Sequence, residues 1–330
     1  MITVEHLSKR YGDIASVDDV SFVCPTGEVT GFLGPNGAGK STTMRMICGL
    51  TRPSAGRSSI DGTAYRDLPE PGRRVGVLLD ASAQHAGRTG RETLGLSAQV
   101  LGLPRGRVDQ MLGLVGLAGP AAKRRVGAYS LGMRQRLGIA HALLGDPSVL
   151  ILDEPANGLD PEGIAWMRRL LEGFTSRGGT VLLSSHLLHE VEAIADRLVI
   201  IAGGTIHADG TLKELLSTSG TLVRSLDPAA MTGALQTAGL AVGDAGNGLL
   251  TVDAEPEAVG RVAADNHLVL VELRPAESAG LEDLFFTLTT TGGAARPDGT
   301  SATGTAPSTR DREPSTRDTA PSTRDREPAA

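Results

Sequence analysis

A glycine-rich segment near the N-terminus has the composition and spacing of a phosphate-binding loop. In the pattern GPNGAGKST, glycines free the backbone N–H groups to surround an anion, a lysine adds positive charge and a hydroxyl can ligate Mg²⁺. We expect ATP or GTP to bind here, with Ser41 as a ligand of Mg²⁺. An ordinary glycine-rich turn is the alternative. The nucleotide-binding candidates are Gly34, Pro35, Asn36, Gly37, Ala38, Gly39, Lys40, Ser41 and Thr42.

The segments on either side of this loop can position it. The apolar run Val29–Leu33 predicts a strand, and the apolar residues that follow Lys40 predict a helix. The N-terminus of that helix would direct its partial positive charge at the phosphates.

Two acidic residues follow another apolar run. Val149–Leu152 predicts a buried strand, and Asp153 and Glu154 come directly after it. Because ligands of parallel sheets bind at the carboxyl ends of strands, we expect this pair to face the phosphate loop. Asp153 would hold Mg²⁺, and Glu154 would act as the general base on the attacking water. The alternative is a charged strand end that begins a turn.

A histidine ends a third apolar run, VLLSSH. At the same sheet edge, His186 could hydrogen-bond the γ-phosphate or the attacking water, which makes it a second catalytic candidate. An ordinary surface histidine and a metal pair with His189 stay open as alternatives.

Composition limits the function classes. The chain has 330 residues, a formal net charge of -6 and 40% hydrophobic residues, which suits one large domain and a smaller one. Its acidic balance argues against a nucleic-acid partner. No apolar run reaches the roughly 18 to 20 residues of a membrane span, and no secretory signal is recognisable, so we expect a cytosolic chain. Cys24 and Cys48 resemble small buried hydrophobes rather than a disulfide or metal site.

The pattern of apolar runs predicts three regions. Residues 1–216 alternate strand and helix patterns, which is typical of an α/β fold with a mostly parallel sheet, and a helical subdomain is expected at about 88–145. Residues 217–290 predict a small α+β domain of order βαββαβ, with a turn at Asn247-Gly248 and a last helix over Leu281–Leu288. Residues 291–330 repeat the string APSTRDREP and predict a disordered tail without chemistry of its own.

With the segment YSLGMRQRLGIAHALLGDP at residues 129–147, these motifs resemble, in order and spacing, the ATP-binding cassette of ABC transporters. The resemblance covers residues 1 to about 216 and implies a P-loop NTPase fold, ATP and Mg²⁺ as cofactors, and two cassettes that dimerise on ATP. It also implies that Tyr11 stacks on adenine, although an aromatic residue that closes the first hairpin is the alternative. Asp160 would link the two sites across the dimer. The signature loop, which acts on the partner subunit's ATP, would be Ser130, Leu131, Gly132 and Met133.

Two positions depart from the family pattern. The usual L-S-G-G-Q of the signature loop reads YSLGM here, and the glutamine expected after the strand Val75–Leu79 is Asp80, with Gln84 the nearest glutamine. A carboxylate cannot donate a hydrogen bond as an amide does, so water positioning and coupling to a membrane partner through Asp80 would differ.

The run NGLDP, the run DGTLKELL and a small trailing domain look similar to cassettes of the drug and antibiotic export branch. This resemblance implies a motor subunit at the cytoplasmic side of the membrane, peripheral, which drives a separate membrane permease. A soluble ATPase of DNA repair or translation is the alternative, although the chain has one phosphate loop and no sustained heptads. A regulatory ATP-binding protein with slow hydrolysis is a third possibility.

Overall fold

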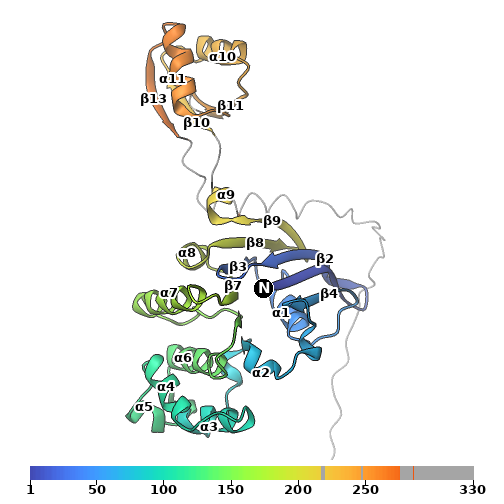
Figure 1. Ribbon diagram of the computed structural model, residues 1–330. Helices are drawn as coiled ribbons and strands as arrows, with labels where there is room; N and C mark the ends of the chain where they lie inside the picture. The colour runs from blue at the N-terminus through green and yellow to red at the C-terminus, as the bar shows by residue number, and fades with distance from the viewer. Residues whose placement is uncertain (217–219, 247, 276–284, 286–330) are drawn as a thin grey trace, which may run out of the picture. The chain divides into compact units, whose positions relative to one another are not determined.

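The apolar runs of the N-terminal region form a six-stranded sheet of order β5-β6-β7-β3-β8-β9 (Figure 1). The first five strands are parallel, and β9 pairs antiparallel with β8. Residues of β3, β6 and β7 are buried along their whole length, because both faces of the sheet are covered. The bounds are β3 Val29–Leu33, β5 Val75–Leu78, β6 Val149–Leu152, β7 Thr180–Ser185, β8 Arg197–Ala202 and β9 Thr205–Thr211.

The structure is a computed structural model that describes residues 1–216, 220–246, 248–275 and 285. Over these ranges it contains no helix with both the length and the apolar character needed to cross a membrane.

A second, antiparallel sheet of order β2-β1-β4 accompanies the first. The register of β1 against β2 shifts around His6, whose φ is 51°, so the apolar alternation along β1 is interrupted. These strands are β1 Ile2–Tyr11, β2 Ile14–Cys24 and β4 Ala55–Ile60.

Two hydrophobic cores cover the two faces of the six-stranded sheet. One joins the sheet to the antiparallel strands and helix α1 (Lys40–Ile47), and within it the rings of Phe22 and Phe32 stack with centroids 5.2 Å apart. The other core joins the opposite face to the helices between residues 90 and 216. Cys24 and Cys48 are free and buried, and burial raises the pKa of each thiol to about 12.

The helices of the N-terminal region begin and end at recognisable local signals. Thr89 and Glu92 form a capping box at the start of α3, and segments with a glycine and a proline, residues 102–104 and 119–120, separate α3, α4 and α5. The bounds are α1 Lys40–Ile47, α2 Pro71–Arg74, α3 Gly90–Val100, α4 Gly106–Leu114, α5 Pro120–Lys123, α6 Leu131–Ala142, α7 Pro161–Thr175, α8 Leu188–Glu192 and α9 Leu212–Leu216; short 3₁₀ turns span Tyr65–Asp67, Ala81–Ala83 and Val126–Ala128.

Residues 221–275 form the predicted βαββαβ order around a core of their own. The sheet is antiparallel with the order β11-β12-β10-β13, and its apolar residues pack with those of α10 and α11. The elements are β10 Thr221–Ser225, α10 Pro228–Thr237, β11 Val242–Gly246, β12 Leu249–Val252, α11 Pro256–Asp265 and β13 Leu270–Pro275.

Three sequence expectations lie outside the described residues: Asn247 of the predicted turn, the helix Leu281–Leu288 apart from Phe285, and the tail 291–330. The bounds of the three predicted regions stay predictions.

Candidate active site

The strand order brings three chain segments to one edge of the six-stranded sheet. Strand β7 lies between β3 and β6, and all three strands run parallel. The phosphate loop after β3, the acidic pair after β6 and the polar end of β7 therefore meet at neighbouring carboxyl ends.

The predicted phosphate loop surrounds a hollow of about 250 Å³. Gly34 itself is buried, and a side chain there would place its Cβ 2.2 Å from the carbonyl oxygen of Ile201. Gly39 has φ 108°, and its Cβ would lie 2.6 Å from the carbonyl oxygen of Ser16. These two glycines are therefore required for close packing of the loop. The hollow is lined by Ser16, Pro35, Asn36, Gly37, Ala38, Gly39, Lys40, Ser41, Thr42 and Glu154.

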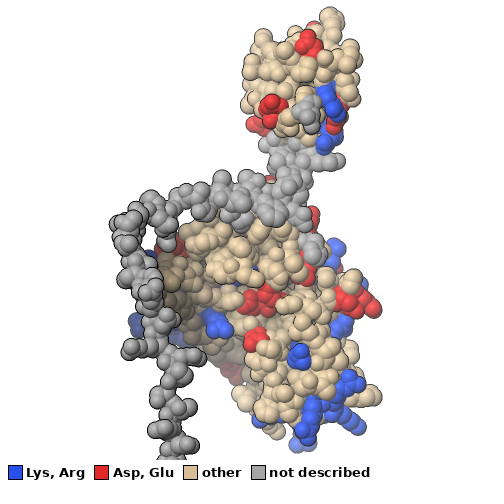
Figure 2. All heavy atoms as spheres, turned by 180° about the vertical axis from the view of Figure 1, so that it is seen from behind, with Lys and Arg blue, Asp and Glu red and all other residues tan. Residues whose placement is uncertain are grey.

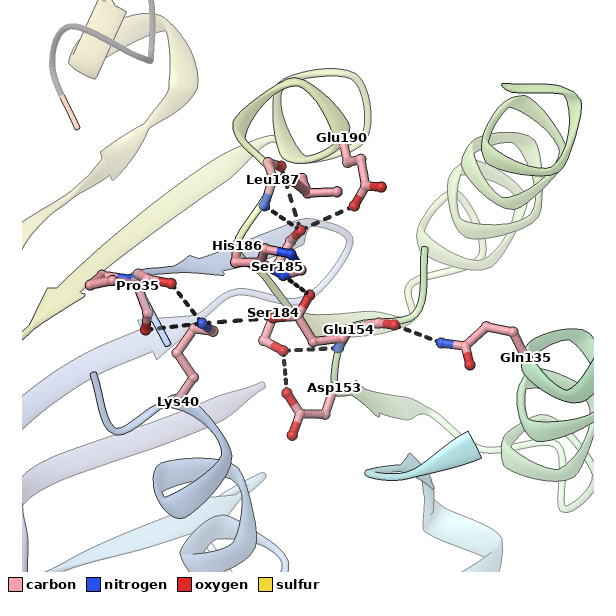
Figure 3. A network of polar contacts seen from close by, with 11 residues as sticks. Pro35, Lys40, Gln135, Asp153, Glu154, Ser184, Ser185, His186, Leu187 and Glu190 are labelled. Carbon is pink, nitrogen blue, oxygen red and sulfur yellow. Dashed lines mark hydrogen bonds and ion pairs between the residues drawn. The ribbon is translucent and has the colours of Figure 1, made fainter. Parts of the chain in front are cut away.

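Lys40 connects the loop to the acidic pair. Its Nζ donates to the carbonyl oxygens of Gly34 (2.6 Å) and Pro35 (3.3 Å), and it lies 3.7 Å from Oε1 of Glu154 (Figure 3). Burial lowers the pKa of Lys40, and the negative charges of Glu154 and Asp153 oppose that shift. The expected proximity of the acidic pair to the phosphate loop is thus observed.

The acidic pair is held by residues of β7 and the segment after it. Nδ1 of His186 donates to Oε2 of Glu154 over 2.8 Å, and the hydroxyl of Ser184 donates to Oδ1 of Asp153. His186 therefore contacts the predicted general base directly. The side chain of His189, named above as a possible metal partner, lies outside what the structure describes.

Sequence reasoning missed two buried side chains that bind the backbone of Glu154. Ser184 Oγ accepts from the N–H of Glu154 at 3.0 Å, and Gln135 Nε2 donates to its carbonyl oxygen at 2.6 Å. The signal for Ser184 was a serine within an apolar strand. The signal for Gln135 was its helical spacing. It lies three residues after Gly132 and four before Ile139, so the three share one face of the helix, and this face is turned inward.

The four residues of the predicted signature loop lie outside this hollow, at the start of α6. Ser130 is the N-cap of α6 and accepts from the N–H of Met133 at 3.2 Å. Leu131 is 43% exposed, and a Cβ on Gly132 would lie 2.9 Å from the carbonyl oxygen of Gly158.

Asp160 and Asp80 have local contacts. Asp160 caps α7 by accepting from the N–H of Gly163 at 2.8 Å. Asp80 accepts from the N–H and hydroxyl of Ser82, and these bonds lower its pKa. Gln84, in contrast, reaches the helix of the signature loop, because its Nε2 donates to the carbonyl oxygen of Arg134 at 3.2 Å.

Tyr11 lies at the end of β1, opposite Ile14 in the first hairpin, and is 54% exposed. Nζ of Lys9 lies 5.0 Å from the centre of its ring. This position is compatible with both expectations for Tyr11, a base platform and an aromatic residue that closes the hairpin.

Comparison with known proteins identifies the family. The family model described as ABC transporter matches residues 17–157. The bacitracin transport ATP-binding protein BcrA of Bacillus licheniformis is 43% identical over 209 residues, which cover 62% of this chain and 68% of that protein. The chain belongs to the ABC transporter ATP-binding proteins. As a member of this family it is an ATPase.

Further relatives agree with this ABC assignment. The lantibiotic transport ATP-binding protein SrtF of Streptococcus pyogenes is 39% identical, with 62% of this chain and 89% of that protein covered. A solved structure described as an ATP binding subunit of an ABC transporter has a TM-score of 0.60 and 32% identity, and the match covers 65% of this chain and 91% of that one. Residues 219–282 match a family model described as a domain of unknown function.

Proposed function

We propose that this ABC ATPase drives export of an antibiotic or a similar compound through a separate membrane permease. One observation carries the catalytic part of the proposal: a buried phosphate-loop lysine and a carboxylate lie 3.7 Å apart at the rim of one hollow. A phosphate cradle and a general base are thereby combined in one site. The transport names of the relatives BcrA and SrtF support the compound class.

Hydrolysis follows from the positions of the side chains. The N–H groups of the phosphate loop and Lys40 bind the β- and γ-phosphates. Glu154 takes a proton from a water molecule whose oxygen attacks the γ-phosphorus, and the bond to the β–γ bridging oxygen breaks to release ADP and phosphate. The bond from His186 to Oε2 keeps the carboxylate of Glu154 directed at this water.

Ser41 and Asp153 suit Mg²⁺, because a hydroxyl and a carboxylate are oxygen donors and phosphate oxygens can complete the coordination. Bound Mg²⁺ would neutralise the charge that develops on the phosphate oxygens. Ser184 would orient Asp153 toward that role through its hydroxyl.

We infer a homodimer from the location of the signature loop. Ser130, Leu131, Gly132 and Met133 begin α6 outside the hollow of their own chain, which leaves the helix N-terminus available to ATP held by a second copy. In such a dimer Asp160 would lie at the interface and Tyr11 would contact adenine. Both roles stay predictions.

The charge distribution supports a peripheral position at the cytoplasmic face of the membrane. Lys and Arg side chains gather over the lower end of the molecule in Figure 2, where α3, α4 and α5 lie. Arg88, Arg105, Lys123, Arg124 and Arg125 in this part are exposed. A positively charged surface is attracted by the anionic inner leaflet, beside which the permease would be embedded.

Two measurements test the proposal. Purified protein with ATP and Mg²⁺ should release phosphate, and absence of both binding and release would refute the ATPase site. The protein should also co-purify with a multi-span membrane protein from solubilised membranes. Recovery with a DNA-repair or translation complex instead would select the non-transport alternative.

A further inference from the structure

The backbone of Glu154 adopts a conformation that most side chains avoid. Its φ is 49°, in the left-handed region, where the Cβ of any residue other than glycine crowds the backbone. Such a conformation persists only where neighbouring groups hold it, and active sites are among the places where it recurs.

Two buried side chains hold this backbone from opposite sides. Ser184 of β7 accepts from the N–H of Glu154, and Gln135 of α6 donates to its carbonyl oxygen. Ser184 is 0% exposed and Gln135 is 3% exposed. A buried amide is costly unless it is hydrogen-bonded, so an apolar side chain would be the ordinary choice at position 135.

Helix α6 also packs against the loop that follows Glu154. A Cβ on Gly132 would lie 2.9 Å from the carbonyl oxygen of Gly158, and a Cβ on Gly158 would lie 2.4 Å from the side chain of Leu131. Helix α6 therefore contacts this loop at Gly158, and it contacts Glu154 itself through the bond from Gln135.

We propose that Gln135 is a positioning residue for the general base. Its amide fixes the carbonyl of Glu154, which keeps the backbone left-handed and the carboxylate 3.7 Å from Lys40 at the rim of the hollow. Gln135 does not touch the reacting atoms and acts through Glu154 alone. This inference rests on the proposed role of Glu154 and deepens it.

The test replaces Gln135 by methionine, which keeps the length and apolar packing and removes the amide. Gln135→Met should lower kcat about 10- to 100-fold, the cost of misplacing a catalytic group by about 1 Å. The KM for ATP and the Kd of a fluorescent ATP analogue should stay within about twofold, because the phosphate loop is unchanged. The carbonyl of Glu154 keeps a second donor, the N–H of Asn157 at 3.2 Å, so the variant should fold.

Gln99→Met is the matched control, since Gln99 is exposed on α3 and should tolerate the same substitution without loss of kcat. Circular dichroism checks that each variant is folded. Should Gln135→Met fail to fold, Gln135→Asn is tested instead. Asparagine keeps the amide, but its side chain is one methylene too short to reach the carbonyl of Glu154.

A double-mutant cycle separates positioning from a general structural role. In a Glu154→Gln background, Gln135→Met should lower the single-turnover rate of ATP hydrolysis by less than about a further twofold, because no carboxylate is left to position. A further loss as large as in the wild type, or an unchanged kcat in Gln135→Met, would overturn the proposal. Wild-type protein without ATPase activity would instead refute the proposed function itself.

Discussion

At the scale of single residues, Glu154 should decide turnover and leave binding intact. Its carboxylate borders the hollow but is not among the groups that would hold the phosphates. Glu154→Gln should therefore bind ATP as the wild type does and lose about 10²- to 10⁴-fold in kcat, the range for removal of a general base. Phosphate release and nucleotide titration measure the two effects, and unchanged turnover would contradict the assignment.

Lys40 should make nucleotide affinity depend on pH. Burial lowers its pKa below the ordinary value of 10.5, so the free protein loses this positive charge at a lower pH than an exposed lysine would. ATP affinity should be full where Lys40 is protonated and should fall as the pH rises toward 10.5. Lys40→Ala should bind more weakly at every pH and lack this decline. ATP titrations from neutral to alkaline pH compare the wild type with Lys40→Ala. Parallel curves of affinity against pH would argue against phosphate binding by Lys40.

The site residues that sequence reasoning could name are those that stand in local motifs. Lys40 and Glu154 could be found because each stands in a short motif directly after an apolar strand. Gln135 and Ser184 carried only a burial signal. Their contacts with Glu154 could not be predicted, since these join positions 19 and 30 residues apart and depend on how α6 and β7 are placed. The roles of Asp80, Tyr11 and Asp160 stay predictions.

At the scale of elements, the helices and strands that can be predicted from sequence are those whose ends carry capping residues or other strong local signals. Helix α10 of the predicted βαββαβ order begins at a clear signal, because Asp227 caps it and Pro228 occupies its first turn. Strand β9 was not predicted, since it includes Asp209 and Gly210, which favour a turn. It forms because the edge of β8 pairs with it, which is a tertiary effect.

The contact between α6 and β5 should be sensitive to a single methyl group. A Cβ at Gly76 of β5 would lie 2.1 Å from the carbonyl oxygen of Ala142, so Gly76→Ala should destabilise the fold by about 1 to 3 kcal/mol. Gly95→Ala is the control, because nothing lies within 4 Å of its added Cβ inside α3. That change should instead stabilise by about 0.5 to 1 kcal/mol. Urea unfolding measures both, and equal midpoints would refute the packing argument.

At the scale of the whole molecule, ATPase activity should not require the repeated tail. Residues 291–330 contain almost no large apolar side chains, so they have little surface to bury against a folded domain. A chain that ends at Thr290 should keep the kcat and KM of the full chain in phosphate-release assays. A collapse of activity in the shortened chain would assign the tail a part in catalysis.

The core of residues 221–275 has a practical consequence. Its buried apolar side chains all come from its own strands and helices, namely Val223, Met231, Leu235, Leu250, Val252, Val259 and Ala263. The contacts described for Lys40 and Glu154 come from residues 34–186, so replacing residues 221–275 with another folded domain should leave phosphate release unchanged.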